Sequence, residues 1–408
     1  MASTTTVKTI GTTGTFSTPQ LWEDGSAADL TTVERSACTT FLVATFVQGE
    51  TLTFVGSGAT GVMLDTDSTG VGTGTYMTYG ITTGNPAASD VITGTSTATC
   101  VLTSGTPDFT GVIWRGQCQN QEFSGTGTQL TIAGATTSST AYKECTTVVG
   151  GSFRDHINVQ TNALRYNASN GCGIINTSDI NYTIVATEAN NRLSNLQVSN
   201  TFSTGRGVNG AVSGGKYNFL IVEAKQTAVS STFAVFAAGA STVTNCVIVQ
   251  RASGADHIAS GSINSPSFFN CTFVAPDDLA TAPTGILSCS AGTVTVTNCG
   301  LFAGDSTKAI TIGAATFNFT TCYSDISGTG GVTQTTYSSE FQNVNDATRD
   351  FRLKTGAAQI DTGTTDATNA AIDIAGTARP SGAAYDVGAW ELVVTLPVTN
   401  SFSPAMCF

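Results

Sequence analysis

The sequence predicts an all-β protein whose main body is a single-stranded parallel β-helix, with a small β domain inserted near the N-terminus. The first observation is composition: the chain has 44 glycines, and only 11% of its residues are charged, against about 25% in an average globular protein. Glycine and asparagine favour turns, whereas threonine and valine favour strands. The second observation is a repeat in the second half of the chain, with a period of 23 to 28 residues, which is typical of a stacked architecture.

The repeat is clearest around four cysteines, each preceded by Asn or Thr. Its copies are 244–249, 269–274, 297–302 and 320–323, with weaker ones at 194–198 and 217–221. The Asn or Thr stands at 195, 218, 245, 270, 298 and 321. This spacing predicts one β-helix coil per repeat, with loops absorbing the differences. We expect the asparagine at each bend to pair its amide with the coils above and below.

The cysteines have a simple interpretation within these coils. The chain has 11 of them, an odd number, with no Cys-x-x-Cys pair and only two histidines, so the spacing of a zinc site is missing. Because side chains alternate along a strand, we interpret Cys246, Cys271, Cys299 and Cys322 as small buried hydrophobic groups in one column. Disulfide-bridged pairs and a metal site are the alternatives.

The chain divides into four predicted parts. Residues 1–40 are expected to cap the β-helix, with a short amphipathic helix between Ser17 and about Leu30 and with Trp22 covering one end of the core. Such a cap protects unpaired strand edges. Residues 41–108 are expected to form the inserted domain, 109–391 the β-helix and 392–408 a tail.

Two resemblances support this division. The run Gly49-Glu50-Thr51-Leu52-Thr53, followed by Gly56-Ser57-Gly58-Ala59-Thr60-Gly61, resembles a β-hairpin module that recurs in bacteriophage structural proteins. A second copy departs from it, since Asp90 replaces the Gly-Glu pair. The segments 10–22, 112–116, 130–134, 151–156 and 161–167 together resemble β-helix proteins encoded in phage and prophage genomes.

The last third resembles the terminus of pectate-lyase-like β-helix proteins. The matching runs are Asp350-Phe351-Arg352-Leu353, Ile360-Asp361-Thr362-Gly363, Arg379-Pro380 and Asp386-Val387-Gly388-Ala389-Trp390-Glu391. This resemblance implies a right-handed β-helix but no particular activity, because a fold does not fix a function. We expect Arg379 to pair with Asp361 or Asp386, and Trp390 to close the lower end of the core.

The charge and the N-terminus limit the partners. The formal charge is −12, from 28 acidic and 16 basic residues, which argues against binding nucleic acid through its phosphates. The first residues lack a basic region followed by an apolar run, so we expect no signal peptide. No stretch approaches the roughly 18–20 apolar residues of a membrane span, and we expect no membrane partner.

The sequence contains no complete catalytic site, and we expect no cofactor and no metal. The strongest cluster is Arg251, Asp256 and His257, with Asp277 and Asp278 on the loop after the next repeat. In an enzyme, Asp256 and one of the later aspartates would form an acid pair, since glycan hydrolysis needs two carboxylates at a defined separation. His257 or Arg251 would assist. The favoured interpretation is that these are solvated loop residues.

Two further groups are weaker candidates. Arg154-Asp155-His156 is interpreted as a structural hydrogen-bond cluster beside the inserted domain. Asp65 and Asp67 are an alternative site for calcium, which prefers oxygen ligands.

The sequence therefore predicts a structural protein of a bacteriophage particle, a capsid-decorating protein on the head surface, with host-surface glycan binding as a further role. The alternatives are a tailspike-like polysaccharide hydrolase or lyase and a secreted β-helix adhesin, which the missing export signal weakens. Expected partners are the major capsid protein or tail components, further copies of the chain as a trimer, and a surface glycan. The expected location is the virion, assembled in the host cytoplasm.

Overall fold

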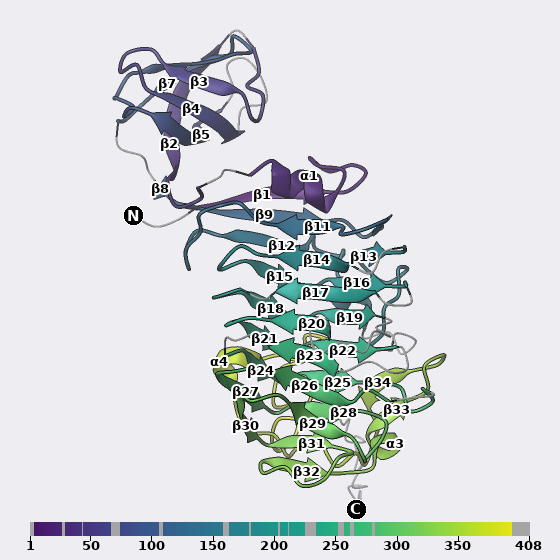
Figure 1. Ribbon diagram of the computed structural model, residues 1–408. Helices are drawn as coiled ribbons and strands as arrows, with labels where there is room; N and C mark the ends of the chain where they lie inside the picture. Colours follow the sequence, from purple (N-terminus) through teal and green to yellow (C-terminus); the bar gives the residue numbers. More distant parts are fainter. Residues whose placement is uncertain are drawn as a thin grey trace, which may run out of the picture.

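The computed structural model is a β-helix with a small β domain at its N-terminal end (Figure 1). It describes residues 4–26, 29–42, 44–66, 74–105, 109–157, 163–178, 181–202, 205–210, 212–224, 234–251, 257–261, 265–279 and 282–393. Three parallel sheets of nine, nine and seven strands make up the β-helix, and each of the seven complete coils contributes one strand to each sheet. Followed from one coil to the next, the chain winds in the right-handed sense, as expected.

The strands of the three sheets stack in chain order. Sheet 1 contains β1 (Thr4–Ile10), β9 (Val112–Cys118), β12 (Lys143–Thr147), β15 (Arg192–Ser194), β18 (Lys216–Asn218), β21 (Thr242–Thr244), β24 (Ser267–Phe269), β27 (Thr293–Thr297) and β30 (Thr316–Thr320). Sheet 2 contains β10 (Glu122–Gly125), β13 (Gly173–Asn176), β16 (Gln197–Asn200), β19 (Ile221–Ala224), β22 (Val247–Gln250), β25 (Thr272–Val274), β28 (Gly300–Phe302), β31 (Cys322–Ser324) and β32 (Val332–Gln334). Sheet 3 contains β11 (Leu130–Ile132), β14 (Tyr182–Ala186), β17 (Arg206–Gly210), β20 (Ala234–Ala238), β23 (His257–Gly261), β26 (Gly285–Cys289) and β29 (Ala309–Ile312).

A single left-handed residue turns the chain from sheet 1 into sheet 2 in six successive coils. These residues are Asn195, Phe219, Asn245, Asn270, Asn298 and Thr321, with φ between 49° and 63°. Asparagine tolerates this conformation better than other non-glycine residues, which explains the repeat. One position corrects the sequence reading: Asn218 pairs with Ser194 and Thr244 inside sheet 1, so Phe219 occupies that bend.

Among the described bend asparagines, Asn195 alone pairs its amide with a neighbouring coil as expected: its Nδ2 donates to Thr146 Oγ1 on β12 at 3.0 Å. Asn195 accepts from Arg154, and Asn298 exchanges two hydrogen bonds with the backbone of Thr364. The side chain of Asn245 has no hydrogen-bond partner among the described residues. The coils are also connected through the backbone, where the N–H groups of five of these six bend residues donate to the next coil, as Asn245 does to Phe269.

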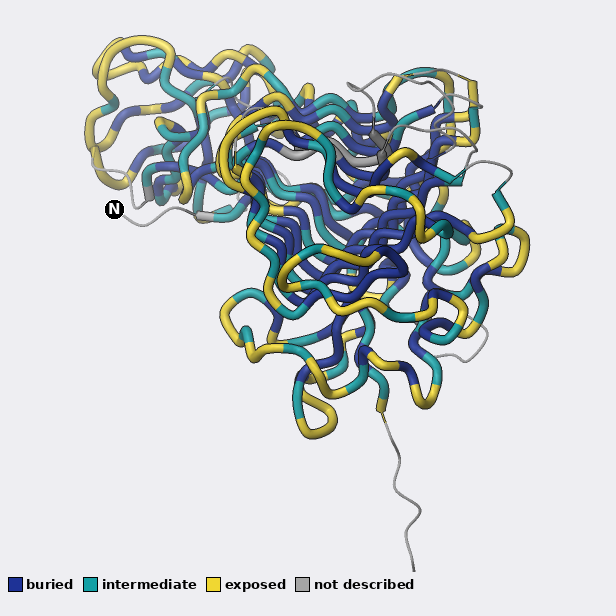
Figure 2. The backbone as a smooth tube through the Cα atoms, turned by 60° about the horizontal axis from the view of Figure 1, so that its bottom comes forward, coloured by how far each residue is buried: buried dark blue, intermediate teal, exposed yellow. Residues whose placement is uncertain are grey.

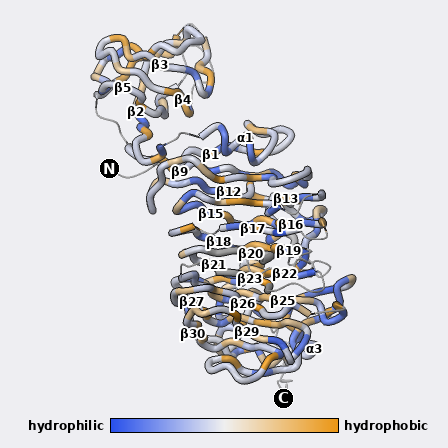
Figure 3. The backbone as a smooth tube through the Cα atoms, viewed as in Figure 1, coloured by the Kyte–Doolittle hydropathy of each residue, from blue (hydrophilic) through white to orange (hydrophobic). Residues whose placement is uncertain are grey.

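The cysteine column is confirmed. Cys246, Cys271, Cys299 and Cys322 directly follow the bends and are fully buried, and none of the ten described cysteines forms a disulfide. They belong to one apolar core that runs through the coils. In Figure 2 the stacked strands are mostly buried and the exposed segments are mostly loops, and in Figure 3 hydrophobic segments recur from coil to coil.

A short helix covers the N-terminal end of the core. Helix α1 (Pro19–Asp24) places Trp22 at zero exposure over the first coil, where the indole N–H of Trp114 donates to its carbonyl. The free edge of β11 is satisfied by side chains of the same helix. The N–H of Thr131 donates to Gln20, and the N–H of Ala133 donates to Glu23.

The small domain is an antiparallel sheet that folds back on itself. Its strand order is β5 (Tyr76–Thr83), β4 (Thr60–Thr66), β3 (Thr51–Phe54), β6 (Val91–Gly94), β7 (Thr99–Leu102), β2 (Val33–Leu42) and β8 (Phe109–Thr110), and β5 also pairs with β2. The domain therefore includes residues that precede position 41.

Asp90 takes over the role of Glu50 in the second copy of the hairpin module. The Glu50 carboxylate accepts from the N–H groups of Val47, in its own turn, and of Ser96, in the other hairpin. The Asp90 carboxylate accepts in the same way from its own turn and from Ser57. The two copies are therefore connected to each other by these two acids.

After β32, residues 335–393 run back along the outside of sheet 2, and we call them the C-terminal strap. The strap contains α3 (Tyr337–Glu340), β33 (Phe341–Asn343), β34 (Asp350–Leu353) and α4 (Ala367–Ala370). Outward-facing Val247, Val274 and Phe302 of sheet 2 form a second apolar cluster with strap residues. Trp390 packs against this outer cluster, so the expectation that it closes the lower end of the core is wrong.

No helix among the described residues combines the length and the apolar character needed to cross a membrane.

Candidate functional site

The structure tests only part of the predicted acid cluster. Asp256 lies outside the described residues, and His257 is described only as the first backbone position of β23. Arg251 follows β22, and Asp277 and Asp278 follow β25, one coil later. Arg251 and Asp278 are brought to the same strap residue, Asp346.

Arg251 is held by two carboxylates. Its Nε and Nη2 donate to the two oxygens of Asp346 at 2.9 and 3.3 Å, and its Nη1 lies 3.8 Å from Glu223 Oε2. Burial lowers the pKa of Arg251, but the hydrogen bonds to Asp346 and the charge of Glu223 outweigh this effect and raise it. A guanidinium in such a pair is a poor proton donor or acceptor.

Glu223 also forms an ion pair with Arg349, an arginine of the strap. It lies on β19 with 1% exposure, and Arg349 donates to both of its oxygens, Nε at 3.3 Å and Nη2 more closely. The backbone N–H of Tyr166 donates to Glu223 Oε1 at 2.8 Å. A buried carboxylate needs this degree of pairing, because an unpaired buried charge is costly. Glu223 thus attaches the strap to sheet 2.

The two loop aspartates have different surroundings, although both are exposed. Asp278 accepts from the backbone N–H of Asp346 at 2.9 Å, whereas the backbone N–H of Asp277 donates to Val344. Burial and then the charge of Asp278 raise the pKa of Asp277. Asp278 helps to hold the strap, so it is more than the solvated residue that the sequence suggested.

Asp277 also lines a pocket of about 360 Å³ between the coils and the strap, together with Asp305, Asp325 and Tyr337. Both oxygens of Asp325 accept backbone bonds, from Ala303 and Gly304. Burial raises the pKa of Asp325 against these bonds. Sequence reasoning missed Asp325, because it follows the last repeat copy and its loop lies beside Asp277 only once the coils are stacked.

The remaining charged candidates have structural contacts. Arg154 begins α2 (Arg154–Ile157) and donates to Ile374 of the strap and to Asn195, so its cluster lies beside the strap and not beside the inserted domain. Asp65 forms an ion pair with Lys8 at 2.5 Å, and Asp67 lies outside the described residues. Across the described part of the chain, no three His, Cys, Asp or Glu side chains are placed to hold a metal ion.

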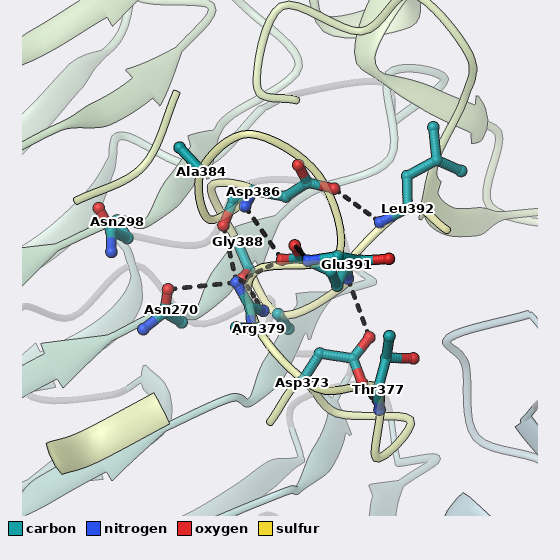
Figure 4. A network of polar contacts seen from close by, with 12 residues as sticks. Asn270, Asn298, Asp373, Thr377, Arg379, Ala384, Asp386, Gly388, Glu391 and Leu392 are labelled. Atoms are coloured by element: carbon teal, nitrogen blue, oxygen red, sulfur yellow. Dashed lines mark hydrogen bonds and ion pairs between the residues drawn. The ribbon is translucent and has the colours of Figure 1, made fainter. Parts of the chain in front are cut away.

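The largest buried group of charges lies in the strap (Figure 4). Arg379 Nη1 lies 3.4 Å from Glu391 Oε2, and the guanidinium donates to the carbonyls of Asp386 and Gly388 at 2.7 and 2.8 Å. The expected partner was Asp361 or Asp386. The actual carboxylate partner is Glu391, because the Asp386 carboxylate accepts from the N–H groups of Asp361 and Leu392.

This group predicts a dependence of stability on pH. Burial raises the pKa of Asp386 to about 6, against the backbone bonds from Leu392 and Asp361. The folded chain therefore binds this proton more tightly than the unfolded chain, whose aspartates titrate near about 3.9. The stabilising contribution is complete below the unfolded pKa and is lost as pH rises through about 6. In the wild-type protein the urea midpoint should fall as pH rises from about 4 to about 6. We expect this fall to be smaller in Asp386→Asn. An unchanged slope would contradict the assignment.

A cavity of about 780 Å³ lies between the small domain and the cap. Phe16, Leu64 and Ile81 give it an apolar wall, and Asp24 and Asp29 contribute the acids. Asp29 is already bonded to Thr31, and Gln48 of the small domain donates to the carbonyl of Gly25. The cap and the small domain therefore contact each other directly beside the cavity.

Comparisons with known proteins concern the fold alone. No family model matches the chain, and no curated protein matches it significantly. Among solved structures, pectate lyase Pel9A is 14% identical, with a TM-score of 0.37 over 69% of this chain and 88% of that chain. The deglycosylated pectin methylesterase from Aspergillus niger is 15% identical, with a TM-score of 0.34 over 58% of this chain and 84% of that chain. What this chain has in common with them is the parallel β-helix.

Proposed function

We propose that this protein is a structural protein of a bacteriophage particle, mounted on the head surface, in which the β-helix is a rigid support and not an enzyme. The observation that supports a non-catalytic role is that Arg251, a member of the predicted acid cluster, is held in ion pairs. Arg251 and Glu223 form ion pairs with Asp346 and Arg349, and these residues attach the strap to the coils.

The surface of sheet 2 supports the same proposal. The strap buries outward-facing Val247 and Val274, so a glycan chain cannot lie along the middle of that face. The assignment to a phage particle is supported by the resemblance of residues 49–61 to a β-hairpin module of bacteriophage structural proteins. In this proposal the small domain projects from one end of the β-helix (Figure 1) and contacts the major capsid protein or tail components, with further copies of the chain forming a trimer.

The test is the location and copy number of the protein in purified particles. We expect peptide quantification to give many copies per particle, on the scale of the major capsid protein, and antibody labelling to mark the head. A few copies confined to the tail tip would contradict head decoration and would favour a tailspike.

A second candidate function is glycan cleavage, because Asp277 and Asp325 share one pocket and both have a raised pKa. A raised pKa suits a general acid. Against this candidate, both oxygens of Asp325 are occupied by backbone donors.

We expect the intact protein to leave host capsule and exopolysaccharide uncleaved, as measured by release of reducing ends or unsaturated products. If cleavage is found, Asp277→Asn and Asp325→Asn identify its site. Asp278→Asn is the matched control, because the Asp278 carboxylate bonds the strap backbone and is not among the residues lining the pocket. Cleavage that is lost in the first two variants and kept in the control would replace the structural proposal.

A further inference from the structure

A lysine is buried between two glutamates at the start of the second coil, beneath the cap. Lys143 begins β12 and its side chain is 2% exposed. Its Nζ lies 2.5 Å from Glu23 Oε1 and 3.0 Å from Glu188 Oε2, and it donates to the carbonyl of Ala133 at 3.0 Å. Glu23 belongs to α1, and Glu188 lies between β14 and β15. Lysine is rarely buried so completely, and here one cation faces two carboxyl groups.

The two glutamates differ in their hydrogen bonds. Both oxygens of Glu23 accept hydrogen bonds, Oε1 from the N–H of Ala133 and Oε2 from the side-chain amide of Gln20. Glu188 Oε2 accepts from the N–H of Ala135 at 3.0 Å, whereas Oε1 is buried and has no hydrogen-bond partner among the described residues. Burial also raises the pKa of Glu188, against the charge of Lys143. Glu188 is therefore the carboxyl that takes a proton, and Oε1 is the oxygen that carries it.

We propose that Lys143 and Glu188 condense to form an intramolecular isopeptide bond, with Glu23 as the base. The Lys143 ammonium gives one proton to the Glu23 carboxylate, and the free Nζ attacks the carboxyl carbon of protonated Glu188. The N–H of Ala135 stabilises the negative charge that develops on Oε2, as a backbone donor does in an oxyanion hole. Glu23 returns its proton to the Oε1 hydroxyl, which leaves as water, and then takes a second proton from Nζ.

The atoms and charges balance without any further reactant. An ammonium, a carboxylic acid and a carboxylate become an amide, one water and a carboxylic acid. The reaction removes one positive and one negative charge from a buried site, and with them the cost of keeping charges out of water. The fold holds the Lys143 ammonium and the Glu188 carboxyl in contact, and this proximity is what such a condensation needs.

The bond would connect the start of the second coil, at β12, to the turn between β14 and β15 that leads into the third coil, directly under the cap. The small domain enters and leaves the β-helix next to this cap (Figure 1), so a load on that domain passes through these coils. A covalent connection at this position keeps the second coil closed when the cap is pulled.

The test is the mass of the intact, denatured, full-length protein after prolonged incubation. We expect the chain to be lighter than its sequence by one water, and tandem mass spectrometry to find a branched peptide joining Lys143 and Glu188. Lys143→Met and the folded variant Glu23→Gln should have their full calculated masses. Glu23→Gln keeps an acceptor for Ala133 but cannot act as a base, so it separates lost chemistry from lost folding.

Lys8→Met is the matched control. Lys8 also contacts one carboxylate at 2.5 Å, that of Asp65, but no second carboxylate of the described residues forms an ion pair with its ammonium. We expect this variant to keep the mass deficit. A succinimide at Asp24-Gly25 would also remove one water, but it gives a linear peptide. A wild-type chain of full mass, or a deficit that persists in Lys143→Met, would overturn the proposal.

Discussion

Replacement of Arg379 by methionine is expected to lower the free energy of unfolding by about 3–5 kcal/mol. Arg379 and Glu391 both have fully buried side chains, and the guanidinium also satisfies the carbonyls of Asp386 and Gly388. Methionine fills much of the volume but leaves the Glu391 carboxylate buried without its cation. The midpoint of urea unfolding, followed by circular dichroism, measures the loss.

Two further variants separate charge from packing. Arg115→Met removes an ion pair with Glu144 whose arginine side chain is 33% exposed, and exposed pairs contribute only about 0–1 kcal/mol. Adding Glu391→Gln to Arg379→Met removes the uncompensated charge and should recover part of the stability. Equal losses in Arg379→Met and Arg115→Met, or no recovery in the double variant, would show that the buried pair is not what stabilises the strap.

Much of the β-helix could be predicted, because its signals are local and recur once per coil. The left-handed bend favours asparagine, and the next residue always enters the core, so Asn245-Cys246 and Asn270-Cys271 make the repeat visible. The same reasoning failed by one residue at Asn218, because the bend there is occupied by Phe219. The ring lies 3.8 Å from the Arg154 guanidinium, a contact that no repeat pattern indicates.

The strap was missed although the sequence contains a signal for it. Val247-Ile248-Val249 is apolar without alternation, and such runs indicate strands that are buried on both faces. The prediction of a β-helix over residues 109–391 accounts only for the side of this strand that faces the core. The partners across the strap are more distant: Glu223 and Arg349 are 126 positions apart, and no local pattern connects them. The candidate site changed for this reason, since its arginine and one aspartate turned out to hold the strap.

The cap contributes the second large effect, and Trp22→Ala is expected to lower the free energy of unfolding by about 3–5 kcal/mol. The indole is fully buried over the first coil, close to Gly116, where a methyl group added to the glycine would meet the ring at 2.6 Å. No side chain from a coil above can fill the space, because α1 is the last layer over the first coil.

Leu21→Ala is the control for Trp22→Ala, because Leu21 is the neighbouring residue of the same helix and is 49% exposed. It should change stability by less than about 1 kcal/mol, as surface substitutions usually do. Trp22→Ala should also increase aggregation, measured by light scattering, because a loosened α1 uncovers the edge of β11, and open strand edges pair with other chains. If both variants unfold at the same urea concentration and remain equally soluble, α1 does not stabilise the β-helix, and the first coil is stable without it.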